Sequence, residues 1–117
     1  MKNEFRPLYD REREVFEKLL SATFSGSQEL MKQLTGMIVS PIDQNGSLAC
    51  LSSESQGAIT EKRIPVEAEC DDRDGVRVHI LLHVVNGLIN ELEVFREDGE
   101  TLLDTINPND MIVLVFP

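Results

Sequence analysis

Residues 66–96 of the chain read VEAECDDRDGVRVHILLHVVNGLINELEVFR. Apolar and polar residues alternate through this segment with a period of two, which is typical of strands that bury one face. The pairs Asp74-Gly75 and Asn86-Gly87 interrupt the alternation, and such pairs are common in the tight turns of β-hairpins. The segment therefore predicts three antiparallel strands, over 62–71, 76–84 and 88–96.

The numbering of the inward residues predicts the register of these strands. The inward apolar positions are even-numbered in all three, so the loops between them need an odd number of residues. Three-residue loops at 73–75 and 85–87 satisfy this condition. Asn90 then faces inward opposite Leu82, a misfit that a β-bulge would remove. The expected pairs are Cys70–Val78, Ala68–Ile80, Ile80–Leu92 and Val78–Val94.

The other face of the three strands carries the candidate site. The predicted register places His79 between Glu69 and Glu93, with Glu91 and His83 in the neighbouring rows. One imidazole and two carboxylates are suitable ligands for Zn²⁺ or Mn²⁺, and a carboxylate also raises the basicity of an adjacent imidazole. Charge pairing on a solvated sheet face is the ordinary alternative, so no metal or cofactor is assigned. The apolar residues on this face are interface candidates, namely Leu81, Ile89 and Phe95.

Residues 8–34 show a helical period instead. A helix is expected over 8–24, where Asp10 is suited to cap the start, and a shorter one over 27–34. The inward residues are Val15, Phe16, Leu19, Leu20 and Phe24 in the first helix, and Leu30 and Leu34 in the second. These stripes predict that the helices pack against one face of the sheet.

Further strands are expected on either side of the central segment. Strands over 37–43 and 47–52 flank the turn Asn45-Gly46, which places Ile42 opposite Leu48. A last strand over 111–116 is apolar on both faces, so it is either central in the sheet or covered by another subunit.

Together these patterns predict one α+β domain over 1–117. Its helical part at 8–34 packs on one face of an antiparallel, hairpin-connected sheet of five to six strands at 37–116. A chain of 117 residues, of which 41% are hydrophobic, is able to bury a core of its own.

The formal net charge of −10 narrows the classes of partner. Phosphate backbones and anionic membrane surfaces repel such a chain, so we expect neither nucleic acid nor membrane as a partner. The sequence contains no apolar run long enough to span a membrane and no apolar signal segment at its start, which favours a cytoplasmic location. Cys50 and Cys70 form no CxxC pair, and we expect two buried thiols rather than a disulfide.

Several short motifs carry a family resemblance. Asp72-Arg73-Asp74-Gly75-Val76 and the later Gly87-Leu88-Ile89-Asn90-Glu91-Leu92-Glu93 resemble a family of small uncharacterised bacterial domains. In that family an Asp-x-Asp-Gly-Val turn is followed by Gly-x-Leu-x-Glu-Leu-(Asp/Glu). Arg6-Pro7-Leu8 and Asn45-Gly46-Ser47-Leu48 also match, so the resemblance covers most of 6–103. The resemblance implies a helix-plus-hairpins fold in a bacterial cytoplasm, and no catalytic residue carries over from it.

The sequence favours a non-catalytic protein-interaction domain over an enzyme. More apolar sheet surface is expected than one helix layer can cover, so we expect a homodimer or another protein partner. Two alternatives stay open. One is an immunity-type protein that neutralises a basic toxin through its acidic surface. The other is a metal-dependent or acid–base enzyme that uses the row Glu69, His79 and Glu93.

Overall fold

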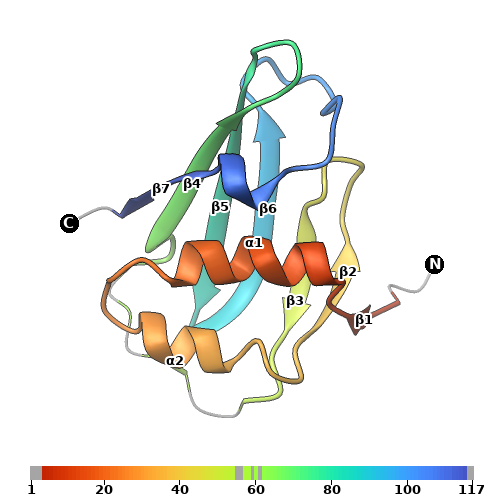
Figure 1. The fold of residues 1–117 in the computed structure, drawn as a ribbon. Coiled ribbons are helices and arrows are strands. Elements are labelled where there is room, and N and C mark those ends of the chain that lie inside the picture. The colour runs from red at the N-terminus through yellow and green to blue at the C-terminus, as the bar shows by residue number, and fades with distance from the viewer. Residues whose placement is uncertain (1–3, 55–56, 59, 61, 116–117) are drawn as a thin grey trace.

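One antiparallel sheet and two short helices make up the fold, and both helices lie across the same face of the sheet (Figure 1). The computed structural model describes residues 4–54, 57–58, 60 and 62–115. In chain order the elements are β1 (Arg6–Pro7), α1 (Asp10–Leu20), α2 (Ser27–Lys32), β2 (Ile38–Pro41), β3 (Leu48–Leu51), β4 (Val66–Asp71), β5 (Arg77–Val85), β6 (Leu88–Arg96), the 3₁₀ helix η1 (Pro108–Asp110) and β7 (Ile112–Val115). The predicted α+β class is confirmed.

Within the described residues the sheet has seven strands, in the order β1-β2-β3-β6-β5-β4-β7. The prediction was five to six strands. It missed β1, because a strand of two residues is too short to show a period of two. β7 lies at one edge of the sheet, so the first of its two predicted positions, central in the sheet, is wrong.

The helical part follows the predicted stripe, although both helices are shorter than expected. The N-cap of α1 is Tyr9 rather than Asp10. The Glu12 carboxylate accepts a hydrogen bond from the Tyr9 N–H (2.8 Å) and two from the Arg6 guanidinium. Gly26, with a φ of 89°, provides the left-handed turn before α2. The buried residues of this part include Val15, Phe16, Leu19, Leu20, Leu30 and Leu34.

The hairpin between β4 and β5 has the predicted register. Ala68 lies opposite Ile80, and Cys70 lies opposite Val78. The Asp72 N–H donates to the Val76 carbonyl (2.9 Å), which closes the expected three-residue loop at 73–75. The local sequence was sufficient to predict this register, because a three-residue loop is consistent with the even-numbered inward positions of both strands.

The hairpin between β5 and β6 has a different register from the predicted one. Its loop is the two-residue turn Asn86-Gly87, in which both residues have positive φ, and Val85 lies opposite Leu88. A bulge then shifts the register between His83 and Val84. The observed pairs Ile80–Val94 and Val78–Arg96 replace the predicted Ile80–Leu92 and Val78–Val94.

The bulge keeps the apolar side chains of β6 on the helix side of the sheet. Leu92 and Val94 are buried as predicted, and Asn90 is exposed rather than inward. Ile89 turns inward and is 1% exposed, so its predicted place on the outer face is wrong.

A buried side chain from the end of α2 stabilises this turn. The Gln33 amide nitrogen donates to the Gly87 carbonyl (2.8 Å), and its amide oxygen accepts from the Ile89 N–H (2.9 Å). The Ala58 N–H donates to the same Gly87 carbonyl (2.8 Å). Buried backbone groups need such partners, and a bulge disrupts the strand ladder that ordinarily supplies them.

The hairpin between β2 and β3 is also shifted from its expected register. Leu48 lies opposite Pro41, whereas the prediction paired it with Ile42. The Ile42 N–H donates to the Ser47 carbonyl (2.9 Å), so the loop spans 43–46. The Asp43 carboxylate accepts from the Asn45 N–H within this loop and from the Ser47 N–H directly after it, a local closure that favours the longer turn.

The two cysteines behave as predicted, since both are buried and free. Burial raises the pKa of Cys50 to about 12. The Cys50 thiol therefore stays protonated at neutral pH and is a poor nucleophile.

A buried arginine joins the two turns at the end of the sheet away from α2 (top of Figure 1). The Arg96 side chain is 5% exposed and donates to the carboxylates of Asp72, Asp74 and Asp98 at 2.7–3.1 Å. Asp72 in turn accepts from the Leu103 N–H (2.7 Å), which attaches the segment after β6. The Arg96 guanidinium thus links the turn between β4 and β5 to the turn that follows β6.

Acid is expected to weaken this cluster. Burial alone would raise the pKa of Asp72, but hydrogen bonds from backbone N–H groups and Arg96 lower it from 3.8 to about 2. A depressed carboxyl pKa stabilises the fold above pH 4 and ceases to do so as the pH falls toward 2. Urea denaturation of Asp72→Asn should therefore depend less on pH between 5 and 2 than that of the natural chain. The exposed Glu17→Gln serves as the control, and equal pH dependence in all three chains would contradict the assignment.

Candidate functional site

The outer face of β4, β5 and β6 does not assemble the predicted row of Glu69, His79 and Glu93. Glu69 lies beside His79 as expected, but His79 lies opposite Phe95 instead of Glu93. The His79 and Phe95 rings stack with centroids 5.1 Å apart, and His79 Nε2 lies 3.0 Å from a Glu97 carboxylate oxygen. The altered β5–β6 register is the reason, since it moves every β6 residue relative to β5.

A second histidine takes the place that His79 was expected to hold. His83 Nε2 lies 2.8 Å from Glu93 Oε1, and Glu91 is the direct neighbour of His83 across the sheet. One ligand atom from each of these three residues lies within 4.8 Å of the others. All three are candidate residues from the sequence, but the predicted register does not place them together.

The hydrogen bonds of His83 define what this cluster can do. Arg63 Nε donates to His83 Nδ1 (3.3 Å), so Nδ1 accepts and the proton of the neutral ring lies on Nε2. Nε2 can then donate to Glu93. A metal ion at Nε2 would have to displace that proton, and the Arg63 cation beside the ring opposes a second positive charge. The arrangement suits a chain of hydrogen bonds better than a metal centre.

The remaining named residues of this face have separate partners. Glu69 accepts from Arg77 at 3.3 Å. Of the interface candidates, Leu81 is half-buried and Phe95 is 37% exposed, whereas Ile89 lies in the core. The outer face thus presents a mixed polar surface with two of the three apolar residues that the sequence predicted.

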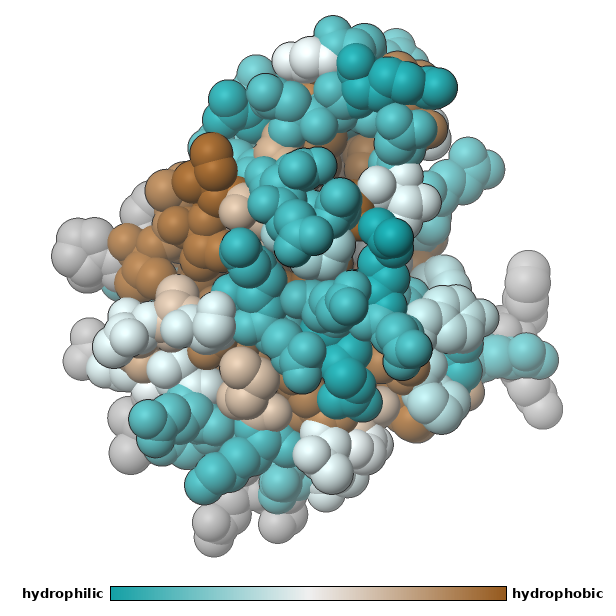
Figure 2. All heavy atoms as spheres, in the orientation of Figure 1, coloured by the Kyte–Doolittle hydropathy of each residue, from teal (hydrophilic) through white to brown (hydrophobic). Residues whose placement is uncertain are grey.

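A continuous apolar surface instead lies along β7. Ile112 is 63% exposed and Val115 is 39% exposed. Figure 2 shows a brown region over β7 and β4, beside the mostly hydrophilic surface of α1. β7 pairs with β4 on one side only, so its other side is an open edge in the described part of the chain.

The opposite edge of the sheet is protected. β1 has two residues, one of which is a proline that lacks an N–H donor. Its other residue, Arg6, carries a charge and pairs with Glu12 at 2.8 Å. Short length, proline and charge are features by which proteins prevent edge pairing. β7 contains neither a proline nor a charged residue.

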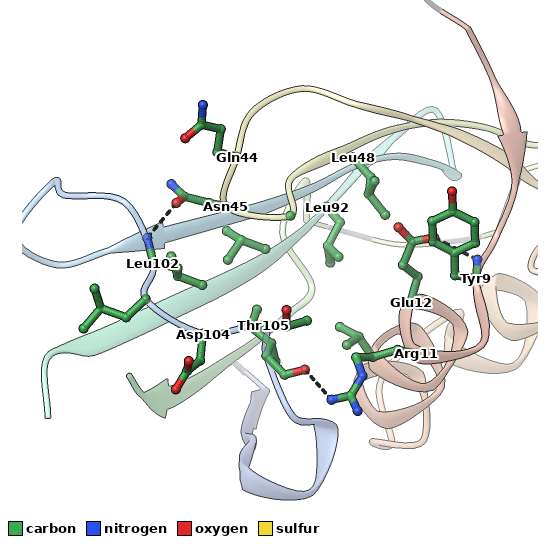
Figure 3. Close-up of a pocket in the computed structure, with 15 residues that line it drawn as sticks. Tyr9, Arg11, Glu12, Gln44, Asn45, Leu48, Leu92, Leu102, Asp104 and Thr105 are labelled. Carbon is green, nitrogen blue, oxygen red and sulfur yellow. Dashed lines mark hydrogen bonds between the residues drawn. The ribbon is translucent and has the colours of Figure 1, made fainter. Parts of the chain in front are cut away.

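A cavity of about 410 Å³ opens between α1, the loop joining β2 and β3, and the segment 102–106 (Figure 3). Leu48, Leu92 and Val94 of the sheet give it an apolar wall, and Arg11 lines its α1 side. No sequence pattern indicates this cavity, because its lining comes from segments that only the fold brings together.

The comparisons with known proteins identify the family. Residues 5–106 match the family model of a domain of unknown function (DUF6984). The chain belongs to this family. No curated protein and no solved structure gave a match.

The DUF6984 match covers some of the features described above and leaves out β7. It includes the outer face, the Arg96 cluster and every residue that lines the cavity, whereas β7 follows its last matched residue. No helix among the described residues is long and apolar enough to cross a membrane.

Proposed function

We propose that this DUF6984 protein is a non-catalytic protein-interaction domain that forms a homodimer through β7. The observation that carries the proposal is the open edge of β7, whose four residues Ile-Val-Leu-Val are uncharged and partly exposed. An unprotected apolar edge strand readily adds a strand from another chain, because its outward N–H and C=O groups lack partners.

A second copy of this chain is the partner that suits this edge. A two-fold axis normal to the sheet, centred on Val113, pairs β7 with itself in antiparallel orientation. Ile112 of one copy then faces Leu114 of the other, and the outer faces of both sheets lie on the same side. With a net charge of −10, two copies repel each other over most surfaces, and an uncharged strand reduces that repulsion at the contact.

The outer face supports a catalytic role less well. The expected Glu69–His79–Glu93 row is not assembled, and both ring nitrogens of His83 are engaged in hydrogen bonds. Cys50 is buried with a raised pKa, so it offers no thiolate at neutral pH. These observations favour binding over acid–base or nucleophilic catalysis.

Light scattering after size exclusion tests the dimer. The natural chain should elute with twice its monomer mass of 13.2 kDa. Ile112→Lys should elute as a monomer, because each introduced lysine lies opposite Leu114 of the other copy and places a charge in an otherwise apolar strand pair. Ile112 is 63% exposed, so the substitution leaves the monomer fold intact.

Ile42→Lys is the matched control, because Ile42 is another exposed isoleucine, 52% accessible, beyond the end of β2. It should remain a dimer. A natural chain that is monomeric at every concentration overturns the proposal and leaves the acidic surface as the candidate for a basic partner. A dimer that persists in Ile112→Lys rejects β7 as the interface.

A further inference from the structure

We propose that the cavity between α1 and the segment 102–106 binds a small apolar monocarboxylic acid. This site is independent of the β7 edge, and it lies wholly within the residues of the DUF6984 match. Its volume of about 410 Å³ falls within the range of roughly 300–1,000 Å³ that is usual for small-molecule sites.

The wall of the cavity determines the apolar part of the ligand. Leu48 comes from β3 and Leu92 and Val94 from β6, and all three are buried residues of the sheet. Val15 of α1 and Leu102 complete this lining from the two other sides. A short alkyl chain that enters the cavity would transfer its own apolar surface from water to this lining, which is the main source of affinity in such cavities.

Arg11 determines the charged end of the ligand. Its guanidinium lines the cavity and donates one hydrogen bond, to the Ile106 carbonyl at 3.3 Å (Figure 3). No carboxylate of the described residues lies within ion-pair distance of it. The remaining N–H donors of a guanidinium suit the two oxygens of a carboxylate.

The other charged groups of the cavity already have partners. Glu12 accepts from Arg6 through both oxygens and from the Tyr9 N–H. Asp104 lies 3.7 Å from the Arg73 guanidinium. These contacts leave Arg11 as the group available to a ligand. The net charge of −10 disfavours multiply charged anions, so a single carboxylate fits best.

Tyr9 allows a direct measurement of binding. The chain contains one tyrosine and no tryptophan, and Tyr9 lines the cavity, so intrinsic fluorescence reports on this site alone. Titration of the natural chain with sodium octanoate should change the Tyr9 emission in a saturable way. The backbone amide signals of Leu92, Val94 and Leu102 should shift in parallel in nuclear magnetic resonance spectra.

Two variants and two further probes separate the parts of the proposal. Arg11→Gln should weaken octanoate binding about tenfold, as expected for loss of a charge-assisted hydrogen bond. Lys18→Gln, with the same change of charge on the same helix, should bind octanoate as the natural chain does. Octan-1-ol should bind the natural chain and Arg11→Gln equally, and octylamine should bind more weakly than octanoate.

Three results would overturn the inference. Absence of a saturable Tyr9 response to octanoate would reject the site. Equal affinity of the natural chain and a folded Arg11→Gln for octanoate would reject the carboxylate contact. Tighter binding of octylamine than of octanoate would show that Glu12 and Asp104 dominate the cavity, which contradicts the assigned ligand class.

Discussion

Replacement of Arg96 by methionine is expected to lower the melting temperature by about 10 °C or more. The methionine fills much of the same space but leaves the carboxylates of Asp72, Asp74 and Asp98 facing one another without a cation. Asp72 is buried, so its charge loses its cationic partner at a position where water cannot replace that partner. Thermal unfolding followed by circular dichroism at pH 7 measures this effect.

Arg77→Met provides the matched control for this result. Arg77 also bridges two carboxylates, those of Asp71 and Glu69, but its side chain is 41% exposed. Exposed ion pairs contribute little to stability, so Arg77→Met should change the melting temperature by only a few degrees. Arg96→Lys should fall between the two, because lysine keeps the charge but lacks the planar fork. Equal losses in Arg96→Met and Arg77→Met would contradict a stabilising role for the buried cluster.

Replacement of Gly87 by alanine is the second change with a large expected effect. Gly87 has a φ of 75°, and a Cβ atom there would lie 2.2 Å from the Ala58 carbonyl oxygen and 2.6 Å from its nitrogen. The obstructing atoms are backbone, so the turn and the segment at 57–58 must separate. We expect the free energy of unfolding to fall by about 3 kcal/mol or more, measured by urea denaturation.

Gly75→Ala measures the backbone part of that loss, so the difference between the two variants gives the steric part. Gly75 has a similar φ of 88°, but a Cβ atom there would meet nothing within 4 Å. The substitution should therefore show only the backbone cost of a left-handed alanine, about 1 kcal/mol. If the two variants were equally stable, close packing between the β5–β6 turn and Ala58 would not contribute to the fold.

The sequence predicted correctly on which face of the sheet the candidate-site residues lie, but it did not predict correctly which residues lie beside them. Glu69, His79 and Glu93 all lie on the outer face, as the alternation of the strands required. The predicted neighbour of His79 was wrong, because residues 91–96 of β6, which lie beyond the bulge, are displaced along β5 by two residues from the predicted register. A displacement of two residues leaves every side chain on the same face and changes every side chain opposite it. His83 therefore meets Glu93, and His79 meets Phe95.

The buried Arg96 was beyond the reach of the sequence for a different reason. Arginine at the end of a strand reads as a solvated residue, and its three aspartates lie in two separate turns that each favour aspartate for local reasons. The closed cluster exists only once the two turns lie side by side. The cavity beside α1 is similar, since its lining comes from both helix and sheet and from the segment after β6.

The amino-acid sequence by itself determined the elements that depend on neighbouring residues. These are the helical stripe of α1, the alternation of β4 to β6, the three-residue loop at 73–75 and the α+β class. The tertiary structure decided the register of β6, because the local sequence is compatible with two alternative turns. These are the predicted three-residue loop at 85–87 and the observed two-residue turn Asn86-Gly87. Gln33 acts from 54 residues away in sequence, donating to the Gly87 carbonyl while it accepts from the Ile89 N–H. A local pattern cannot contain a hydrogen bond whose partner arrives only when the chain has folded.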